Sequence, residues 1–105
     1  MTDPSIPTTD IHAVPAVIGD DLVVLDVRED HEWAAGHIDG ALHIPLAELP
    51  LRIGELDPAV PTLVVCHLGG RSAMATQYLQ AQGHDATNVA GGMDAWEQAG
   101  RPVSS

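Results

Sequence analysis

Two short apolar runs most restrict what this chain can fold into: "LVVLDV" at residues 22–27 and "TLVVC" at residues 62–66. Both are rich in β-branched residues, and neither alternates apolar with polar positions. That pattern is typical of strands buried on both faces of a sheet, which occur in parallel sheets covered by helices on each side. The two runs therefore predict a parallel sheet at the centre of the molecule.

Segments with helical features separate the predicted strands. Residues 29–36 carry acidic side chains in their first turn and end at Gly36, and residues 71–82 run to a stop at Gly83. The remaining elements are predicted from shorter patterns: strands at 41–44 and 86–90, helices within 46–56 (interrupted by Pro50) and 92–100, and a short helix capped by Thr9 and limited by Pro15. The alternation predicts an α/β domain, with a mainly parallel sheet flanked by helices on both faces.

The length of 105 residues predicts a single domain with one core. Residues 1–8, with two prolines and several small polar side chains, read as a flexible N-terminal arm, and residues 9–103 as the domain. No apolar run approaches the roughly 18–20 residues that span a bilayer. The first residues also lack the basic start and apolar stretch of a signal peptide.

The charge of the chain restricts its partners. The formal net charge is −11, and the only basic residues besides histidine are four arginines. Such a chain repels nucleic acid and anionic membranes, so neither is an expected partner. The single cysteine forms no internal disulfide, and a free thiol suits a reducing cytoplasm, where we expect the protein to reside.

That cysteine, Cys66, ends the second apolar run and is followed by "HLGGRS". A tight loop with Gly69 and Gly70 can turn successive N–H groups toward one point, and a helix starting near Arg71 adds its own free N–H groups. Such surroundings lower the pKa of a cysteine and favour its thiolate. The alternative is an inert buried cysteine, which is common at strand ends. The position after a strand and before a helix favours the reactive thiolate.

Four segments in order make the chain similar to a known family. They are "VLDVRE" (24–29), "EWAAGHIDGALHIP" (32–45), "CHLGGRS" (66–72) and "GGMDAW" (91–96). With these segments, about residues 9–103 resemble the single-domain rhodaneses, a family of sulfurtransferases. The resemblance implies a rhodanese-like α/β fold with a roughly five-stranded, mainly parallel sheet.

The resemblance also implies an activity. Cys66 would accept a sulfane sulfur from thiosulfate, a persulfide or a polysulfide, and pass it from a persulfide to cyanide, a thiol or an acceptor protein. Neither a metal nor another cofactor is expected. The alternative is a non-enzymatic module that carries persulfide or docks on a partner. The loop residues that would bind the donor are His67, Leu68, Gly69, Gly70, Arg71 and Ser72.

Loop length and composition refine the expected substrate. Four residues separate Cys66 from Arg71, whereas the related phosphatases and arsenate reductases have one more, so the shorter loop favours sulfur over phosphate. Leu68 offers no polar contact, and His67 is only partly charged near neutral pH. Because of these two residues, a persulfide, a polysulfide or a protein donor is expected as readily as thiosulfate.

Other polar residues have a structural and a functional interpretation. Asp26 and Arg28 are candidate supporting residues that orient the edge of the site. In the structural interpretation, which we favour, Arg28 would instead bridge Glu32 or bind backbone carbonyls. His31, His37 and His43 recur every six residues, which fits neither helix nor strand period, so no metal site is expected. By the resemblance, His37 is a hydrogen-bonded structural residue. Trp33 and Trp96 are predicted to pack in the structure, and Gly91 and Gly92 to allow a tight turn near Cys66.

Overall fold

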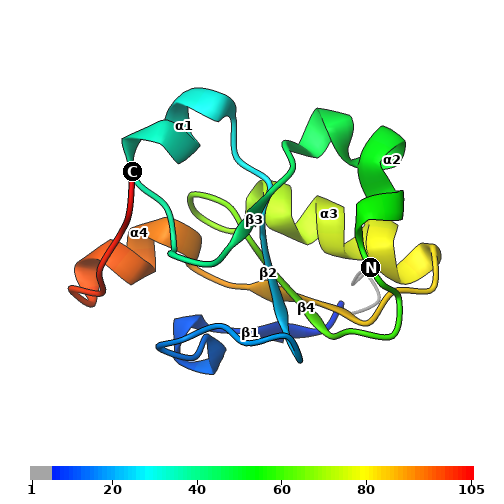
Figure 1. The fold of residues 1–105 in the computed structure, drawn as a ribbon, viewed down its shortest axis with the longest axis horizontal. Coiled ribbons are helices and arrows are strands. Elements are labelled where there is room, and N and C mark those ends of the chain that lie inside the picture. The colour runs from blue at the N-terminus through cyan, green and yellow to red at the C-terminus, as the bar shows by residue number, and fades with distance from the viewer. Residues whose placement is uncertain (1–5) are drawn as a thin grey trace, which may run out of the picture.

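The computed structural model describes residues 6–105, in which strands and helices alternate along the chain (Figure 1). The strands are β1 (Thr8–Thr9), β2 (Val23–Asp26), β3 (Leu42–His43), β4 (Thr62–Val65) and β5 (Ala86–Val89). The α-helices are α1 (Asp30–Ala35), α2 (Leu49–Arg52), α3 (Gly70–Ala81) and α4 (Gly92–Gln98). Single 3₁₀ turns are η1 (Ile11–Ala13), η2 (Leu46–Glu48) and η3 (Ile53–Glu55).

The five strands form one sheet in the order β1-β5-β4-β2-β3, and every pair is parallel. The two apolar runs identified in the sequence become β2 and β4, which lie side by side near the middle of the sheet with Asp26 opposite Val65. Each of these two strands has four residues, and almost all of them are buried. The predicted α/β fold with a parallel sheet is confirmed.

Neighbouring residues of the central strands point to opposite faces and supply two separate cores. Leu25, Val64 and Cys66 lie in a buried cluster with α3, whereas Val24 and Val65 lie in a second cluster with α4. Helices therefore cover both faces of the sheet, with α2 beside α3 and α4 apart from them (Figure 1). Because Cys66 continues the alternation of β4, its side chain lies on the face covered by α3.

The start of the chain differs from the prediction. Thr9 does not cap a helix: it lies in β1, where its carbonyl accepts from Ala90 N at 2.8 Å. The cap is Asp10, whose side chain accepts from His12 N at 2.9 Å, and the turn ends after Ala13. The helix stays this short because Val14 precedes a proline and is extended, at φ −84° and ψ 118°.

Pro50 does not interrupt the helical segment after β3. It lies in the first turn of α2, directly after η2. A proline is tolerated there because the first N–H groups of a helix have no partner within it. The prediction of an interruption at Pro50 was therefore wrong.

Residues 1–5 of the predicted N-terminal arm lie outside the described residues, and Thr8, its last residue, belongs to β1. The boundary between arm and domain stays a prediction. None of the helices in residues 6–105 combines the length and apolar character needed to cross a bilayer.

Candidate active site

Cys66 is the first residue after β4, at the carboxyl end of the sheet, and four residues connect it to Arg71 in the first turn of α3. Ligands of parallel α/β sheets bind at this edge, where strands end and helices begin. The connection is tight because Gly69 takes a φ of +128°, which side chains rarely adopt. The loop from Cys66 to Gly70 is called the cysteine loop below.

The cysteine loop is held from outside by the start of α4. The carbonyls of Cys66, His67 and Leu68 accept from the N–H groups of Met93 (2.8 Å), Asp94 (2.9 Å) and Gly91 (3.1 Å), in that order. In a trans peptide the N–H points opposite to the carbonyl, and residues 6–105 contain no cis bond. The N–H groups of His67, Leu68 and Gly69 therefore point away from α4, toward the sulfur side of the loop.

Gly92 makes this contact possible. A Cβ at this position would lie 2.2 Å from the carbonyl oxygen of Cys66 and 2.8 Å from that of His67, far inside contact distance. Its φ of +48° is also unfavourable for a side chain. The predicted role of the glycine pair, a tight turn beside the cysteine loop, is confirmed.

The sulfur of Cys66 lies among hydrogen-bond donors. Its Sγ accepts from Gly69 N at 3.1 Å and lies 3.3 Å from Ser72 Oγ. Burial raises the pKa of the thiol, but the hydroxyl of Ser72 and the backbone N–H groups of Ser72, Gly69 and Arg71 favour the thiolate more strongly. The net result is a pKa below the ordinary value of a cysteine, in the direction that the sequence predicted.

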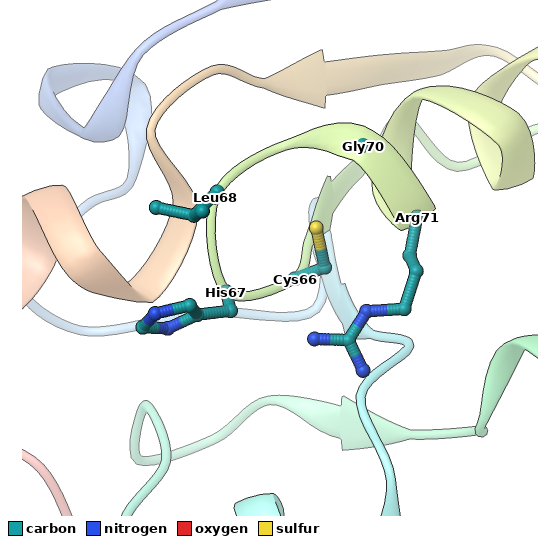
Figure 2. Close-up of a pocket in the computed structure, with 5 residues that line it drawn as sticks. All are labelled: Cys66, His67, Leu68, Gly70 and Arg71. Atoms are coloured by element: carbon teal, nitrogen blue, oxygen red, sulfur yellow. The ribbon is translucent and has the colours of Figure 1, made fainter.

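An open pocket of about 290 Å³ gives access to this sulfur, lined by Cys66, His67, Leu68, Gly70 and Arg71. In Figure 2 the loop curves round the sulfur, while the side chains of His67 and Leu68 point away from it. Leu68 is 63% exposed. The lining beside the sulfur thus consists of backbone, one apolar side chain, one imidazole and one guanidinium.

Arg71 does not offer a free positive charge to this pocket. Its guanidinium binds both carboxylate oxygens of Glu32 in α1, at 2.6 and 2.9 Å. Glu32 also accepts from Glu29 N at 3.0 Å, so it joins the start of α1 to the start of α3. The hydrogen bond from Arg71 holds the pKa of Glu32 near 2, despite partial burial, and the same pair raises the pKa of Arg71.

Asp26 and Arg28 form a buried ion pair beside this arrangement, not within it. Arg28 Nη2 donates to Asp26 Oδ2 at 2.8 Å and to the carbonyl of Gly36, also at 2.8 Å. The predicted contact between Arg28 and a carbonyl is confirmed, whereas the alternative bridge to Glu32 was wrong. The pair fixes the end of β2 to the end of α1, and so holds the helix from which Glu32 reaches Arg71.

The three regularly spaced histidines do not gather at one point. His37 and His43 both stack on Trp33, with ring centroids 3.6 and 4.7 Å away, and His31 is exposed. His37 Nδ1 donates to the carbonyl of Trp33 and His43 Nε2 to that of Arg28, each at 2.8 Å. The structural roles predicted for His37 and Trp33 agree with these contacts. Trp96 packs in the second buried cluster.

Comparisons with known proteins agree with this fold and loop. Residues 13–99 match the family model of the rhodanese-like domain. The chain is 40% identical to YtwF of Bacillus subtilis over 83 residues, and this aligned region spans 79% of this chain and 81% of that protein. It is 43% identical over 75 residues to the thiosulfate sulfurtransferase GlpE of Pseudomonas putida, spanning 70% of this chain and 68% of that one.

A solved structure, that of a rhodanese-related protein from Thermoplasma volcanium, superposes with a TM-score of 0.76 at 36% identity, over 80% of this chain and 84% of that one. The chain belongs to the rhodanese-like domain family, as its sequence motifs predicted. Relatives in the family carry the name sulfurtransferase, as GlpE does. The family membership supports sulfur transfer as the class of chemistry.

Two contacts of the site were not predicted. The sequence placed Glu32 with Asp26 and Arg28 but did not pair it with Arg71, because the two lie 39 positions apart. Asn88, in β5, was not singled out, yet its side chain lies 2.6 Å from Ser72 Oγ. The available signal was an amide side chain within a strand whose other members are largely buried.

Proposed function

We propose that the protein is a sulfurtransferase that carries sulfur on Cys66 as a persulfide. It takes the sulfur from thiosulfate, a persulfide or a polysulfide and passes it to a thiol or to cyanide. The observation that carries the proposal is the position of Sγ, between the N–H of Gly69 and the hydroxyl of Ser72 beneath an open pocket. Donors in this arrangement favour the thiolate, which is the nucleophilic form of cysteine.

The proposed reaction consists of two nucleophilic displacements at sulfur. The Cys66 thiolate attacks the sulfane sulfur of the donor, an S–S bond forms to Cys66, and the old S–S bond breaks, releasing sulfite or an organic thiolate. An incoming thiolate or cyanide then attacks the outer sulfur of the persulfide, and the Cys66 thiolate leaves. Each step moves one negative charge and needs no cofactor. A reducing cytoplasm keeps such a thiol free and suits this chemistry.

The cysteine loop supports both steps. The outer sulfur of the persulfide carries the negative charge between the steps, and the N–H groups of His67 and Leu68 point away from α4 on the side of the loop where it would rest. Hydrogen bonds from α4 hold the loop in this shape before any donor arrives. Fixed dipoles stabilise developing charge without reorganising during the reaction.

The pairing of Arg71 bears on the choice of donor. Thiosulfate is a dianion and gains most from an uncompensated cation, but Arg71 is bound to Glu32 through both oxygens. Leu68, which also lines the pocket, has an exposed apolar side chain that offers an anion no polar contact. These features favour organic persulfides and polysulfides over thiosulfate as donors, although Arg71 still lines the pocket.

A carrier or docking role for the same domain is the alternative. The exposed Leu68 at the mouth of the pocket is the observation that favours it, because an apolar side chain there suits contact with a partner protein. A carrier would take up one sulfur on Cys66 yet turn over slowly with small acceptors. An enzyme would release product many times per protein molecule.

Thiocyanate release from cyanide tests the proposed function. The assay uses thiosulfate and an organic persulfide as alternative donors, with the unaltered protein and Cys66→Ser. We expect many turnovers with at least one donor, and none above background for Cys66→Ser. Uptake of a single sulfur without turnover would favour the carrier, and an equal rate in Cys66→Ser would overturn both roles.

A further inference from the structure

Asn88 reaches the reactive sulfur through one hydroxyl. Its Oδ1 lies 2.6 Å from Ser72 Oγ, and Ser72 Oγ lies 3.3 Å from Cys66 Sγ. Ser72 and Cys66 are almost fully buried, and Asn88 is 7% exposed. Cys66 directly follows β4, Ser72 lies in α3 and Asn88 lies in β5, and the three side chains form a continuous chain of polar atoms.

The hydroxyl of Ser72 has one proton and more than one acceptor. Oγ lies 3.1 Å from the carbonyl oxygen of Gly69, in addition to Asn88 Oδ1 and the sulfur. A thiol can donate to the hydroxyl, which then donates to Asn88. A thiolate only accepts, so the hydroxyl must turn its proton toward the sulfur. Once its proton points to the sulfur, the hydroxyl of Ser72 no longer donates to Asn88 Oδ1. Its oxygen then faces Asn88 as an acceptor and needs a donor there.

A side-chain amide can supply either partner. Half a turn about χ2 exchanges Oδ1 and Nδ2 of Asn88, which have nearly the same shape. Within residues 6–105, Asn88 Nδ2 has no hydrogen bond that such a turn would break. With the thiol, the chain runs from Sγ–H to Oγ–H to Oδ1. With the thiolate, it runs from Nδ2–H to Oγ–H to Sγ, and the thiol proton has left through the pocket to solvent.

We propose that Asn88 is a positioning residue that sets the direction of the Ser72 hydroxyl and lets the hydrogen-bond chain fit both the protonated and the ionised sulfur. The chain in its ionised form contains a hydrogen bond to a charge, which is stronger than its neutral counterpart. Asn88 therefore stabilises the thiolate more than the thiol. The inference rests on Cys66 being the reactive group of the proposed function, but it concerns ionisation and not the donor.

The test measures ionisation without any sulfur donor. The rate of alkylation by iodoacetamide, followed from acid to alkaline pH, reports the Cys66 thiolate without ambiguity because the chain has one cysteine. The variant is Asn88→Leu, which keeps the branched shape and removes both the donor and the acceptor. We expect a higher Cys66 pKa and alkylation about three- to tenfold slower at pH values below it, the size of one hydrogen bond.

A second background separates positioning from packing. In Ser72→Ala, the change Asn88→Leu is expected to leave the alkylation profile unmoved, because the connecting hydroxyl is gone. Thr76→Val is the matched control: it removes a buried hydroxyl that binds the carbonyl of Ser72 but not the sulfur. Arg71, its partner Glu32 and the neighbouring His67 are unchanged in every variant.

Two results of the alkylation experiment would overturn the proposal. An unchanged profile in Asn88→Leu would mean that the carbonyl of Gly69 alone orients the hydroxyl. An equal shift with and without Ser72 would mean that Asn88 acts through packing. Should Asn88→Leu not fold, the side-chain amide ¹H–¹⁵N signals of Asn88 in the unaltered protein decide: they are expected to titrate with Cys66 and to stop doing so in Ser72→Ala. Signals that ignore the ionisation of Cys66 would also overturn the proposal.

Discussion

Arg71 and Glu32 lie 39 positions apart in the sequence and form a bidentate ion pair, with N–O distances of 2.6 and 2.9 Å, at the edge of the pocket that Cys66 lines. The other three arginines are also engaged: Arg28 with Asp26, Arg52 with Glu48 and Glu55, and Arg101 with the carbonyls of Ile11 and Val14. The guanidinium that lines the pocket, that of Arg71, is therefore already neutralised. We infer that Glu32 limits how much positive charge the pocket presents.

Removing the charge of Glu32 is expected to change donor preference. In Glu32→Gln, Arg71 keeps a hydrogen-bonding neighbour but regains its net charge, which favours a dianion over a singly charged persulfide. We expect kcat/KM for thiosulfate, relative to that for an organic persulfide, to rise about three- to tenfold. Glu48→Gln is the control, since it removes a partner of Arg52 at an exposed site. An unchanged ratio would show that the ion pair does not control donor choice.

The same ion pair makes stability depend on pH in the acid range. The folded state holds the pKa of Glu32 near 2, mainly through the hydrogen bond from Arg71. Because this pKa is depressed, the stabilisation is complete above the ordinary carboxyl pKa and is lost as pH falls toward about 2. Urea unfolding at several pH values should show a shallower acid loss in Glu32→Gln than in the unaltered protein. Equal slopes would contradict the assignment.

Gly92 is expected to be indispensable for the shape of the cysteine loop. Gly92→Ala forces a Cβ to within 2.2 Å of the carbonyl of Cys66, in addition to its strain at positive φ. We expect a loss of about 3 kcal/mol or more in the free energy of unfolding and at least a tenfold loss of sulfur transfer. Gly83→Ala isolates the strain, because Gly83 has a φ of +88° and nothing within 4 Å of the added atom. It should cost about 1 kcal/mol and leave activity intact.

Ser72 is expected to lower the pKa of Cys66 directly. In the unaltered protein, the alkylation rate should rise with pH to a plateau, with a midpoint below the ordinary pKa of a cysteine. Ser72→Ala removes the hydroxyl donor, so the level should be reached at higher pH, and the rate below it should fall about three- to tenfold. Identical profiles would mean that the backbone N–H groups alone favour the thiolate.

Local patterns were sufficient to predict the fold and the position of Cys66. Buried strands leave continuous apolar runs, and the glycines after Cys66 and at Gly91 and Gly92 mark turns that other residues make at a cost. These features depend only on residues close together in the sequence. The glycine pair likewise predicted a tight turn, and its place beside the cysteine loop was expected after the family resemblance had been recognised.

Local patterns did not predict which side chains from distant segments of the sequence meet. The partner of Arg71 is chosen by the packing of α1 against the start of α3, so a sequence with fifteen acidic residues gives no reason to select Glu32. Asn88 faces Ser72 because β5 lies beside β4, and only the strand order reveals this. Likewise, β1 has two residues, too few for any period, and the parallel contact with β5 alone creates it.

The mass of the intact protein after one exposure to donor tests the central claim, sulfur transfer through Cys66, most directly. The protein is incubated with thiosulfate, an organic persulfide or a polysulfide, and the donor is then removed. Its intact mass is measured by mass spectrometry before and after addition of cyanide. We predict a gain of one sulfur atom, about 32 Da, that cyanide removes and that Cys66→Ser never acquires. A mass that stays unchanged with every donor, or a gain that persists in Cys66→Ser, would contradict a persulfide on Cys66.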